Sequence, residues 1–202
     1  MSTAAATRRT FPVLADLIGV NSRQGARVRD VVLTIIGTAF ITVAGYITIP
    51  LPFTPVPISL ATFAVLLTGA ALGPLRGSAS AGLYLVLGLV GVPLFAHGAS
   101  GWAFSSFGYI VGYVVAALIV GALARRRSDR SVWSTLGLAA VGSLTIYAFG
   151  VPWLAAFAGI DLAAAFALGV LPFLIGDAVK IVAMAGLLPA TWRIVDRAGE
   201  RS

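Results

Sequence analysis

An aspartate and a lysine, Asp177 and Lys180, stand three residues apart in the otherwise apolar stretch ALGVLPFLIGDAVKIVAMAGLLPA, residues 167–190. On a helix this spacing places both side chains on one face, where they can pair. A charge at the centre of a membrane helix costs roughly 2.5–3.5 kcal/mol on insertion scales, so each one needs a partner, a cavity or a ligand. The pair indicates either a ligand site, in which Lys180 holds an anion and Asp177 accepts hydrogen bonds, or a self-contained contact that fixes helix packing.

Other catalytic and metal-binding patterns are missing from the sequence. It has no cysteine and one histidine, His97, which excludes thiol chemistry and multi-histidine metal sites. It also lacks the G-x-x-x-x-G-K-[ST], H-E-x-x-H and G-x-S-x-G motifs. We therefore expect no ATP hydrolysis by this chain, no enzymatic activity, no cofactor and no metal. The acidic residues other than Asp177 are expected to be solvated. His97 could touch a ligand from its loop, although a solvated histidine is the simpler expectation.

Composition predicts the class of protein. The chain of 202 residues is 59% hydrophobic and only 10% charged, whereas a soluble domain has about 25% charged residues. An all-α, polytopic membrane protein is expected, with membrane lipid as its surroundings. The net charge of +7 does not indicate nucleic acid, because the basic residues stand at the ends of apolar segments. The first 30 residues lack an apolar core, so the first spanning helix should act as the insertion signal.

Six apolar stretches predict six transmembrane helices in one domain, each long enough or nearly so to cross a core about 30 Å thick. The expected organisation is a cytoplasmic N-terminal segment (1–30), a six-helix domain (31–193) and a cytoplasmic tail (194–202). The stretches are 31–49, 58–73, 78–96, 107–124, 132–157 and roughly 163–190.

The basic residues predict the orientation. Thirteen of the 14 Lys and Arg residues stand in the N-terminal segment, in the loops after the second and fourth stretches, and in the tail. The remaining one is Lys180, and the loops 50–57, 97–106 and 158–162 hold none. Cytoplasmic loops carry an excess of Lys and Arg. Both termini are therefore expected in the cytoplasm, with the three uncharged loops outside.

Two of the expected outer loops have a composition that suggests a further role. The segment PLPFTPVPIS (50–59) is too rich in proline for a helix, and HGASGWAFSSFG (97–108) is rich in glycine and aromatic residues. Together they could cover a cavity, or the prolines could simply end the first helix.

Glycines within the spans, such as Gly121, predict close helix packing. A stripe of small residues on the first helix could pack inside the bundle or contact another protein; it consists of Thr38, Thr42 and Gly45.

Four motifs, in this order and spacing, resemble the BioY family, the biotin-specific substrate-binding subunits of energy-coupling factor (ECF) transporters. They are P-V-P-I-S at 55–59, G-P-x-R-G at 73–77, G-x-P-x-F-A at 91–96, taken as the end of the third helix, and G-D-x-x-K at 176–180. The resemblance covers most of residues 31–193. It implies a six-helix subunit in the bacterial plasma membrane that binds biotin near the outer face. Such subunits work with a transmembrane coupling protein and a pair of cytoplasmic ATP-binding subunits.

The resemblance also implies which residues bind. Asp177 and Lys180 match the G-D-x-x-K motif and become the best candidates for biotin binding. The glycines Gly98 and Gly101 would let the outer loop close. The aromatic residues that could wall the ligand, or merely pack, are Tyr84, Phe95, Trp102 and Tyr109. Thr38, Thr42 and Gly45 would face the coupling protein.

Three other functions are compatible with the residues alone. A proton-coupled or stand-alone secondary transporter would use Asp177 as a proton carrier. An intramembrane enzyme would use Asp177 and Lys180 as acid and base, although no second catalytic motif supports it. A membrane scaffold would show no binding phenotype on Asp177→Asn.

Overall fold

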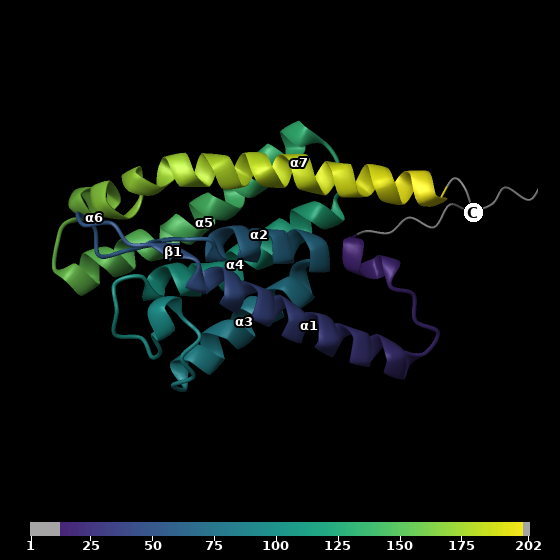
Figure 1. The fold of residues 1–202 in the computed structure, drawn as a ribbon, viewed down its shortest axis with the longest axis horizontal. Coiled ribbons are helices and arrows are strands. Elements are labelled where there is room, and N and C mark those ends of the chain that lie inside the picture. Colours follow the sequence, from purple (N-terminus) through teal and green to yellow (C-terminus); the bar gives the residue numbers. More distant parts are fainter. Residues whose placement is uncertain (1–12, 200–202) are drawn as a thin grey trace, which may run out of the picture.

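The computed structural model of the protein describes residues 13–199, which form helices that run back and forth between two ends (Figure 1). The described chain begins and ends at the same end of the bundle, which also carries the turn from α4 to α5 (Figure 1). The elements in chain order are η1 (Leu14–Leu17), α1 (Arg23–Tyr46), β1 (Thr48–Ile49), β2 (Ile58–Ser59), α2 (Ala61–Leu72), α3 (Pro74–Leu89), η2 (Ala96–Gly98), α4 (Phe107–Arg125), α5 (Val132–Ala158), α6 (Leu162–Gly169), η3 (Leu171–Phe173) and α7 (Leu174–Gly199).

The helices confirm the predicted all-α fold and differ in length. Four segments of the described chain are long and apolar enough to cross a membrane: Arg23–Tyr46, Phe107–Arg125, Val132–Ala158 and Leu162–Gly199. The helix α2 has 12 residues and is therefore about 18 Å long at 1.5 Å per residue. That is shorter than a hydrocarbon core of about 30 Å. The helix α2 alone is therefore too short to be the second transmembrane span that was expected at 58–73.

Helical structure extends past both predicted limits of the domain at 31–193. The first helix begins at Arg23, inside the predicted N-terminal segment, because Ser22 caps it: the Ser22 side chain accepts a 2.9 Å hydrogen bond from the Gly25 amide. The last helix continues to Gly199, inside the predicted tail. The expectations for residues 1–12 and 200–202 lie outside the described part of the chain.

The sixth predicted helix is broken into α6, η3 and α7. Pro172 stands at the start of η3, and a proline cannot donate the backbone hydrogen bond that would continue α6. Asp177 consequently lies in the first turn of α7, and not halfway along a single helix as the sequence suggested. The N-terminal end of a helix carries a partial positive charge that favours a carboxylate.

The proline-rich segment 50–59 is non-helical, as predicted. The strands β1 and β2 pair antiparallel, with Thr48 opposite Ser59, and the proline-rich segment connects them. The third predicted helix ends earlier than expected, since α3 stops at Leu89. Gly91 follows with a φ of 102°, so the motif G-x-P-x-F-A lies in the loop to α4 and does not end the helix.

Glycines bring helices into backbone contact, as the sequence predicted. A Cβ on Gly77 of α3 would lie 2.7 Å from the Cα of Gly69 in α2. A Cβ on Gly69 would in turn lie 2.8 Å from the carbonyl oxygen of Ala117 in α4. The three helices therefore approach one another at positions where no side chain fits.

The small residues of α1 pack inside the bundle. Thr38 is 6% exposed and donates a 3.0 Å hydrogen bond to the carbonyl of Ser80 in α3. Gly45 is buried, and a Cβ there would lie 3.2 Å from the hydroxyl of Tyr84. Thr42 is half-buried. The sequence left open whether these residues pack inside the bundle or contact another protein. In the structure Thr38 and Gly45 pack inside the bundle, and Thr42 is partly accessible.

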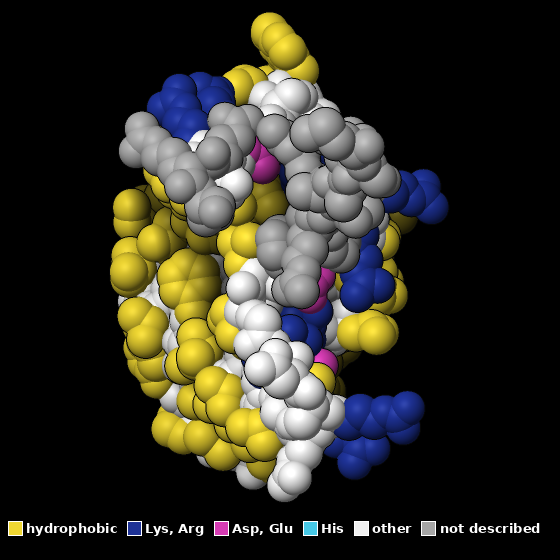
Figure 2. Space-filling view, turned by 90° about the vertical axis from the view of Figure 1, so that its right-hand side faces the viewer, with side chains coloured by type: hydrophobic (Ala, Val, Ile, Leu, Met, Phe, Trp, Pro, Cys, Tyr) yellow, Lys and Arg dark blue, Asp and Glu magenta, His cyan; other side chains and the backbone are white. Residues whose placement is uncertain are grey.

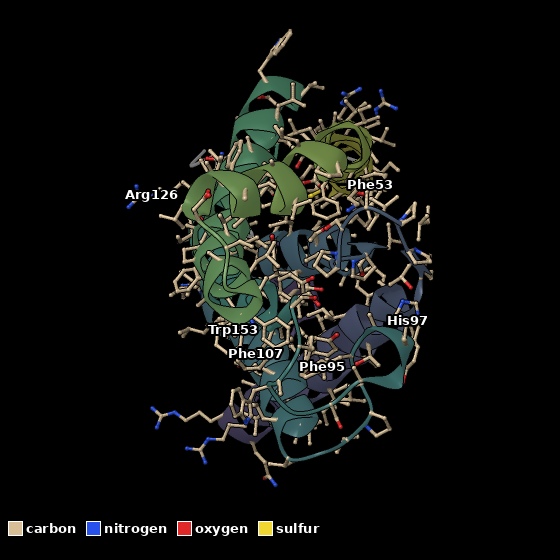
Figure 3. All side chains as sticks on the ribbon, turned by 90° about the vertical axis from the view of Figure 1, so that its left-hand side faces the viewer. Phe53, Phe95, His97, Phe107, Arg126 and Trp153 are labelled. Atoms are coloured by element: carbon tan, nitrogen blue, oxygen red, sulfur yellow. The ribbon has the colours of Figure 1, made fainter. Side chains whose placement is uncertain are left out.

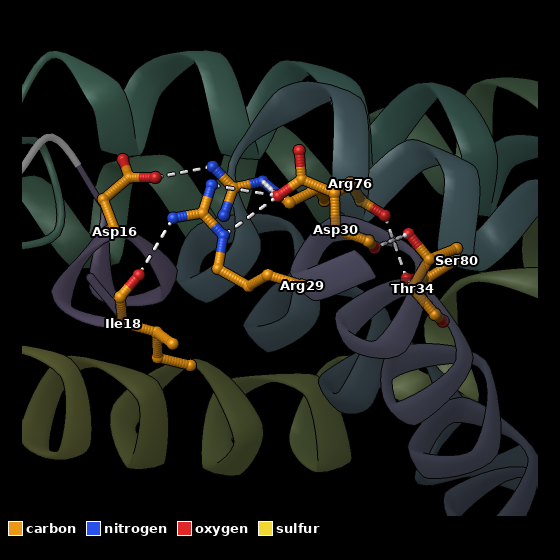
Figure 4. A network of polar contacts seen from close by, with 7 residues as sticks. All are labelled: Asp16, Ile18, Arg29, Asp30, Thr34, Arg76 and Ser80. Carbon is orange, nitrogen blue, oxygen red and sulfur yellow. Dashed lines mark hydrogen bonds and ion pairs between the residues drawn. The ribbon is translucent and has the colours of Figure 1, made fainter. Parts of the chain in front are cut away.

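A polar network fastens η1 to the helices behind it (Figure 4). Arg76 of α3 pairs with Asp16 of η1, which is therefore not the solvated acid that was expected. Arg29 of α1 pairs with Asp30 at 3.0 Å and donates to the carbonyl of Ile18. Figure 2 looks onto this end of the bundle and shows Lys and Arg side chains at several points around it. The basic residues thus gather where the described chain begins and ends.

Asp129, in the turn between α4 and α5, is fully buried and corrects the expectation of a solvated acid. Its Oδ2 accepts a 2.6 Å hydrogen bond from Nε1 of Trp192 in α7. The guanidinium of Arg130 lies over the Trp192 ring, 3.7 Å from its centroid. Burial raises the pKa of the Asp129 carboxyl, and the Trp192 hydrogen bond and nearby Arg130 partly oppose this shift. The turn is thereby attached to α7.

Replacing Asp129 with asparagine is expected to flatten the pH dependence of stability. An unfolded aspartate titrates at about pH 4. Because the folded pKa is higher, the folded state retains the proton above that pH, and stability declines as the pH rises through the folded pKa. Asp129→Asn retains an acceptor for Trp192 without a charge to bury. Thermal unfolding in detergent at a series of pH values from about 4 to about 7 measures this slope.

The control for this experiment is Asp129→Ala, which leaves the Trp192 donor without its acceptor. We expect a lower unfolding temperature than for Asp129→Asn at every pH, since an unmade buried hydrogen bond costs about 1–3 kcal/mol. Equal pH slopes for wild type and Asp129→Asn would contradict the raised pKa.

Candidate ligand-binding site

A cavity of about 280 Å³ lies among the helices, the proline-rich segment and the loop between α3 and α4, close to the lower end of the range for small-molecule sites. The loop before α2 contributes Pro55, Val56 and Pro57, and the loop before α4 contributes Phe104 and Ser105. Gly45 of α1, Phe173 of η3 and residues of β2, α2, α3, α4, α5 and α7 complete the wall. Both of these loops therefore line the cavity, which is the arrangement that their composition suggested.

Asp177 and Lys180 form one polar end of this cavity. The Lys180 Nζ lies 3.1 Å from the Asp177 Oδ1. It also donates to the carbonyl of Ser59 and to the hydroxyl of Thr62, each at 2.8 Å. The Asp177 residue is 9% exposed. The predicted pair exists, it is largely withdrawn from the surface, and it faces a cavity instead of only joining two helices.

Tyr147 of α5 completes the polar end and was not predicted from the sequence. Its hydroxyl donates a hydrogen bond to the Oδ2 of Asp177. A tyrosine within an apolar helix needs a partner for its hydroxyl, and this is the signal that could have pointed to it. Thr62, at the start of α2, was missed as well, because nothing in the sequence relates it to a lysine 118 residues away.

Aromatic side chains form the walls. Tyr84 of α3 is 1% exposed and Tyr109 of α4 is 5% exposed, and both line the cavity as predicted. The Tyr109 hydroxyl donates a 2.9 Å hydrogen bond to the carbonyl of Gly169 at the end of α6. Tyr113 and Phe104 add to the wall without having been predicted. The cavity is thus a mostly apolar space with a few polar groups at fixed positions, as is typical of small-molecule sites.

Three contacts hold in place the two loops that line the cavity. The Ser105 hydroxyl donates a 2.7 Å hydrogen bond to the carbonyl of Pro55, which joins the two loops. The Thr54 hydroxyl donates to the carbonyl of Leu168 in α6 at 2.8 Å. The Nε2 of His97 lies 3.3 Å from the Thr48 hydroxyl.

Four of the predicted binding residues do not line the cavity. Phe95 packs edge-on against Tyr84 and fills the space beside α3, so it supports the wall from behind. Gly98 and Gly101 shape the loop through φ angles of 74° and 78°. Trp102 is 61% exposed and packs against Trp153 (Figure 3 labels Phe95 and Trp153). These residues position the loop, while its cavity-lining side chains come from neighbouring positions.

Comparison with known proteins decides the family. The sequence profile of the BioY family matches residues 16–197, nearly the whole chain. The chain belongs to the BioY family. Two BioY relatives named "Biotin transporter BioY" support this: the Rhizobium etli protein is 34% identical over 78% of this chain and 89% of its own. The Thermotoga maritima protein is 34% identical over 78% of this chain and 92% of its own.

A further BioY relative and one solved structure agree. The "Probable biotin transporter BioY" of Pyrococcus horikoshii is 41% identical over 62% of this chain and 74% of its own. The crystal structure of an S-component for biotin from an ECF-type ABC transporter has a TM-score of 0.76, at 24% identity, over 86% of this chain and 95% of the other. This chain is therefore a multi-pass membrane protein of a transporter family and not an enzyme.

Proposed function

We propose that this chain is a membrane-embedded, high-affinity biotin-binding subunit for biotin uptake. The observation that carries the proposal is the cavity of a BioY-family chain, in which Asp177, Lys180 and Tyr147 converge on a mostly apolar space. Biotin is a compact apolar bicycle with a ureido group that has two N–H donors and one carbonyl. Asp177 and the Tyr147 oxygen can accept from the N–H groups, and Lys180 can donate to the carbonyl.

We further propose a topology of six spans, with α6, η3 and α7 together forming the sixth. The thirteen Lys and Arg residues in the termini and in two loops support cytoplasmic termini. The outer loops then lie on the far side of the membrane, where they close over biotin after it enters. The domain limits at 31 and 193 are widened accordingly to include the whole of α1 and α7.

Energy for uptake would come from ATP-binding subunits through a transmembrane coupling protein. The chain has no nucleotide-binding motif of its own, and the structural neighbour is a component of an ECF-type ABC transporter. Thr38 and Gly45 are buried against α3. Of the three small residues on α1, Thr42 is therefore the one proposed to contact a coupling protein directly.

Uptake of labelled biotin tests this function. Cells that lack their own biotin transporter would express the chain with or without ECF coupling and ATP-binding subunits. We expect rapid uptake with the partners that survives a protonophore but ceases when the ATP-binding subunits carry inactive nucleotide sites. Uptake without partners that a protonophore abolishes would instead identify a secondary transporter.

A further inference from the structure

The polar end of the cavity is electrically balanced, and its lysine is fully engaged. An ammonium group has three N–H donors, and in Lys180 all three have an acceptor within 3.1 Å. Each oxygen of Asp177 likewise has a donor, one from Lys180 and one from Tyr147. An uncharged ureido group can exchange hydrogen bonds with such a set. A carboxylate would bring an additional negative charge beside Asp177, whereas the uncharged ureido carbonyl can take over one of the Lys180 N–H bonds without that repulsion.

His97 is the other basic residue among those that line the cavity in the described chain. It belongs to the loop between α3 and α4 (labelled in Figure 3) and is exposed. Its backbone has φ 59° and ψ 22°, in the left-handed region. A residue other than glycine is uncommon there, although histidine is tolerated better than most. The loop thus holds an imidazole at the cavity in a conformation that glycine would adopt more easily.

The β1–β2 hairpin relates this imidazole to the polar end. Thr48 and Ser59 are partners in its register. His97 contacts the side chain of Thr48, while Lys180 donates to the carbonyl of Ser59. One short hairpin therefore positions both basic groups, on the two strands of the same pair. A ligand with a neutral polar group at Lys180 and an anion at its other end would find a separate basic group for that anion.

We infer that His97 binds the carboxylate of the ligand and thereby fixes its orientation. The ureido group lies at Asp177, Tyr147 and Lys180, and the valerate chain runs toward the outer loop, where the imidazole donates an N–H bond to the carboxylate. This inference rests on biotin being the ligand, as proposed above. It makes His97 a determinant of specificity for an acid over its neutral derivatives.

Equilibrium binding by calorimetry tests this assignment with the detergent-purified full chain. The ligands are biotin and its neutral carboxamide, which differ only at the group that His97 would contact. The variants are His97→Asn, which tolerates the left-handed backbone, and His97→Gly, which removes any backbone strain. Wild type should prefer biotin to the amide by roughly 10- to 100-fold, the size of one hydrogen bond to a charged group.

Both variants should lose this preference by binding biotin more weakly while binding the amide as wild type does. Unchanged amide binding also shows that the variants fold and that the loop still closes. A preference that persists in both variants, or an equal loss for both ligands, would overturn the assignment of the carboxylate. A folded wild type that binds neither ligand would refute the proposed biotin function itself, which is a different result from either of these.

Discussion

Replacing Asp177 with asparagine is expected to weaken biotin binding by about 30-fold or more, because truncating one partner of a buried, hydrogen-bonded charge pair costs about 2–5 kcal/mol. The variant leaves the charge of Lys180 without its counter-ion and replaces one carboxylate oxygen by an amide that donates instead of accepting. The ureido N–H groups of biotin would then lose one of their proposed acceptors. Calorimetric titration of the purified chain with biotin measures the change.

Tyr147→Phe provides a graded comparison at the same site. It removes one hydroxyl but no charge, so we expect a loss of only about 2- to 10-fold, the range of the one neutral hydrogen bond that the Tyr147 oxygen is proposed to accept from the ureido group. Asp161→Asn is the matched control. Asp161 caps α6 by accepting from the Ala164 amide and lies outside the cavity lining, and asparagine is an equally good cap. Biotin binding by Asp161→Asn should equal that of wild type.

The result for Asp177→Asn separates two roles of the ion pair. Wild-type affinity in both Asp177→Asn and Lys180→Met would mean that the pair only stabilises the packing of α7, and the ligand would then bind on other helices. A loss in both variants, with unchanged unfolding temperature, would place the ligand at this pair.

Replacing Gly121 with alanine is expected to lower the unfolding temperature by about 2–12 °C. A Cβ at this position in α4 would lie 2.5 Å from the backbone carbon of Gly73 and from the backbone nitrogen of Pro74, at the turn between α2 and α3. These are backbone atoms, so no side-chain rotation relieves the overlap and the helices must separate. Overpacking costs about 1–3 kcal/mol, and each kcal/mol lowers the temperature by about 2–4 °C for a chain of this size.

Two other glycines provide the controls. Gly137 of α5 and Gly186 of α7 have no atom within 4 Å of the added Cβ. Alanine favours a helix by about 0.8–1 kcal/mol over glycine, so Gly137→Ala and Gly186→Ala should unfold at or slightly above the wild-type temperature. Thermal unfolding in one detergent compares the three variants. An unchanged unfolding temperature for Gly121→Ala would show that α4 does not contact this turn.

Much of the architecture was predictable because apolar length is a strong and local signal. The helices α4 and α5 begin and end within one or two residues of the predicted stretches. The proline-rich segment was correctly predicted to be non-helical, since the constraint acts within the residue itself. The prediction of one continuous last helix was wrong, because Pro172 breaks that stretch into α6, η3 and α7. Hydropathy alone does not register that break.

The polar pair could be found from spacing, but its surroundings could not. Asp177 and Lys180 are neighbours on one helix, so an i, i+3 pattern is enough to identify them. Tyr147, Thr62 and His97 come from other elements and meet the cavity only through the packing of the bundle.

The family was determined by the sequence, through four motifs in order and spacing, and so was the membrane class, through composition. The tertiary structure decided which side chains line the cavity: Tyr84 and Tyr109 do, whereas Phe95 and Trp102 do not. It also decided that Asp129 is buried and that Thr38 and Gly45 pack internally. The reason is physical, because a residue's type limits the contacts it can make, but exposure and partners depend on residues that are distant in the chain and are brought close by helix packing.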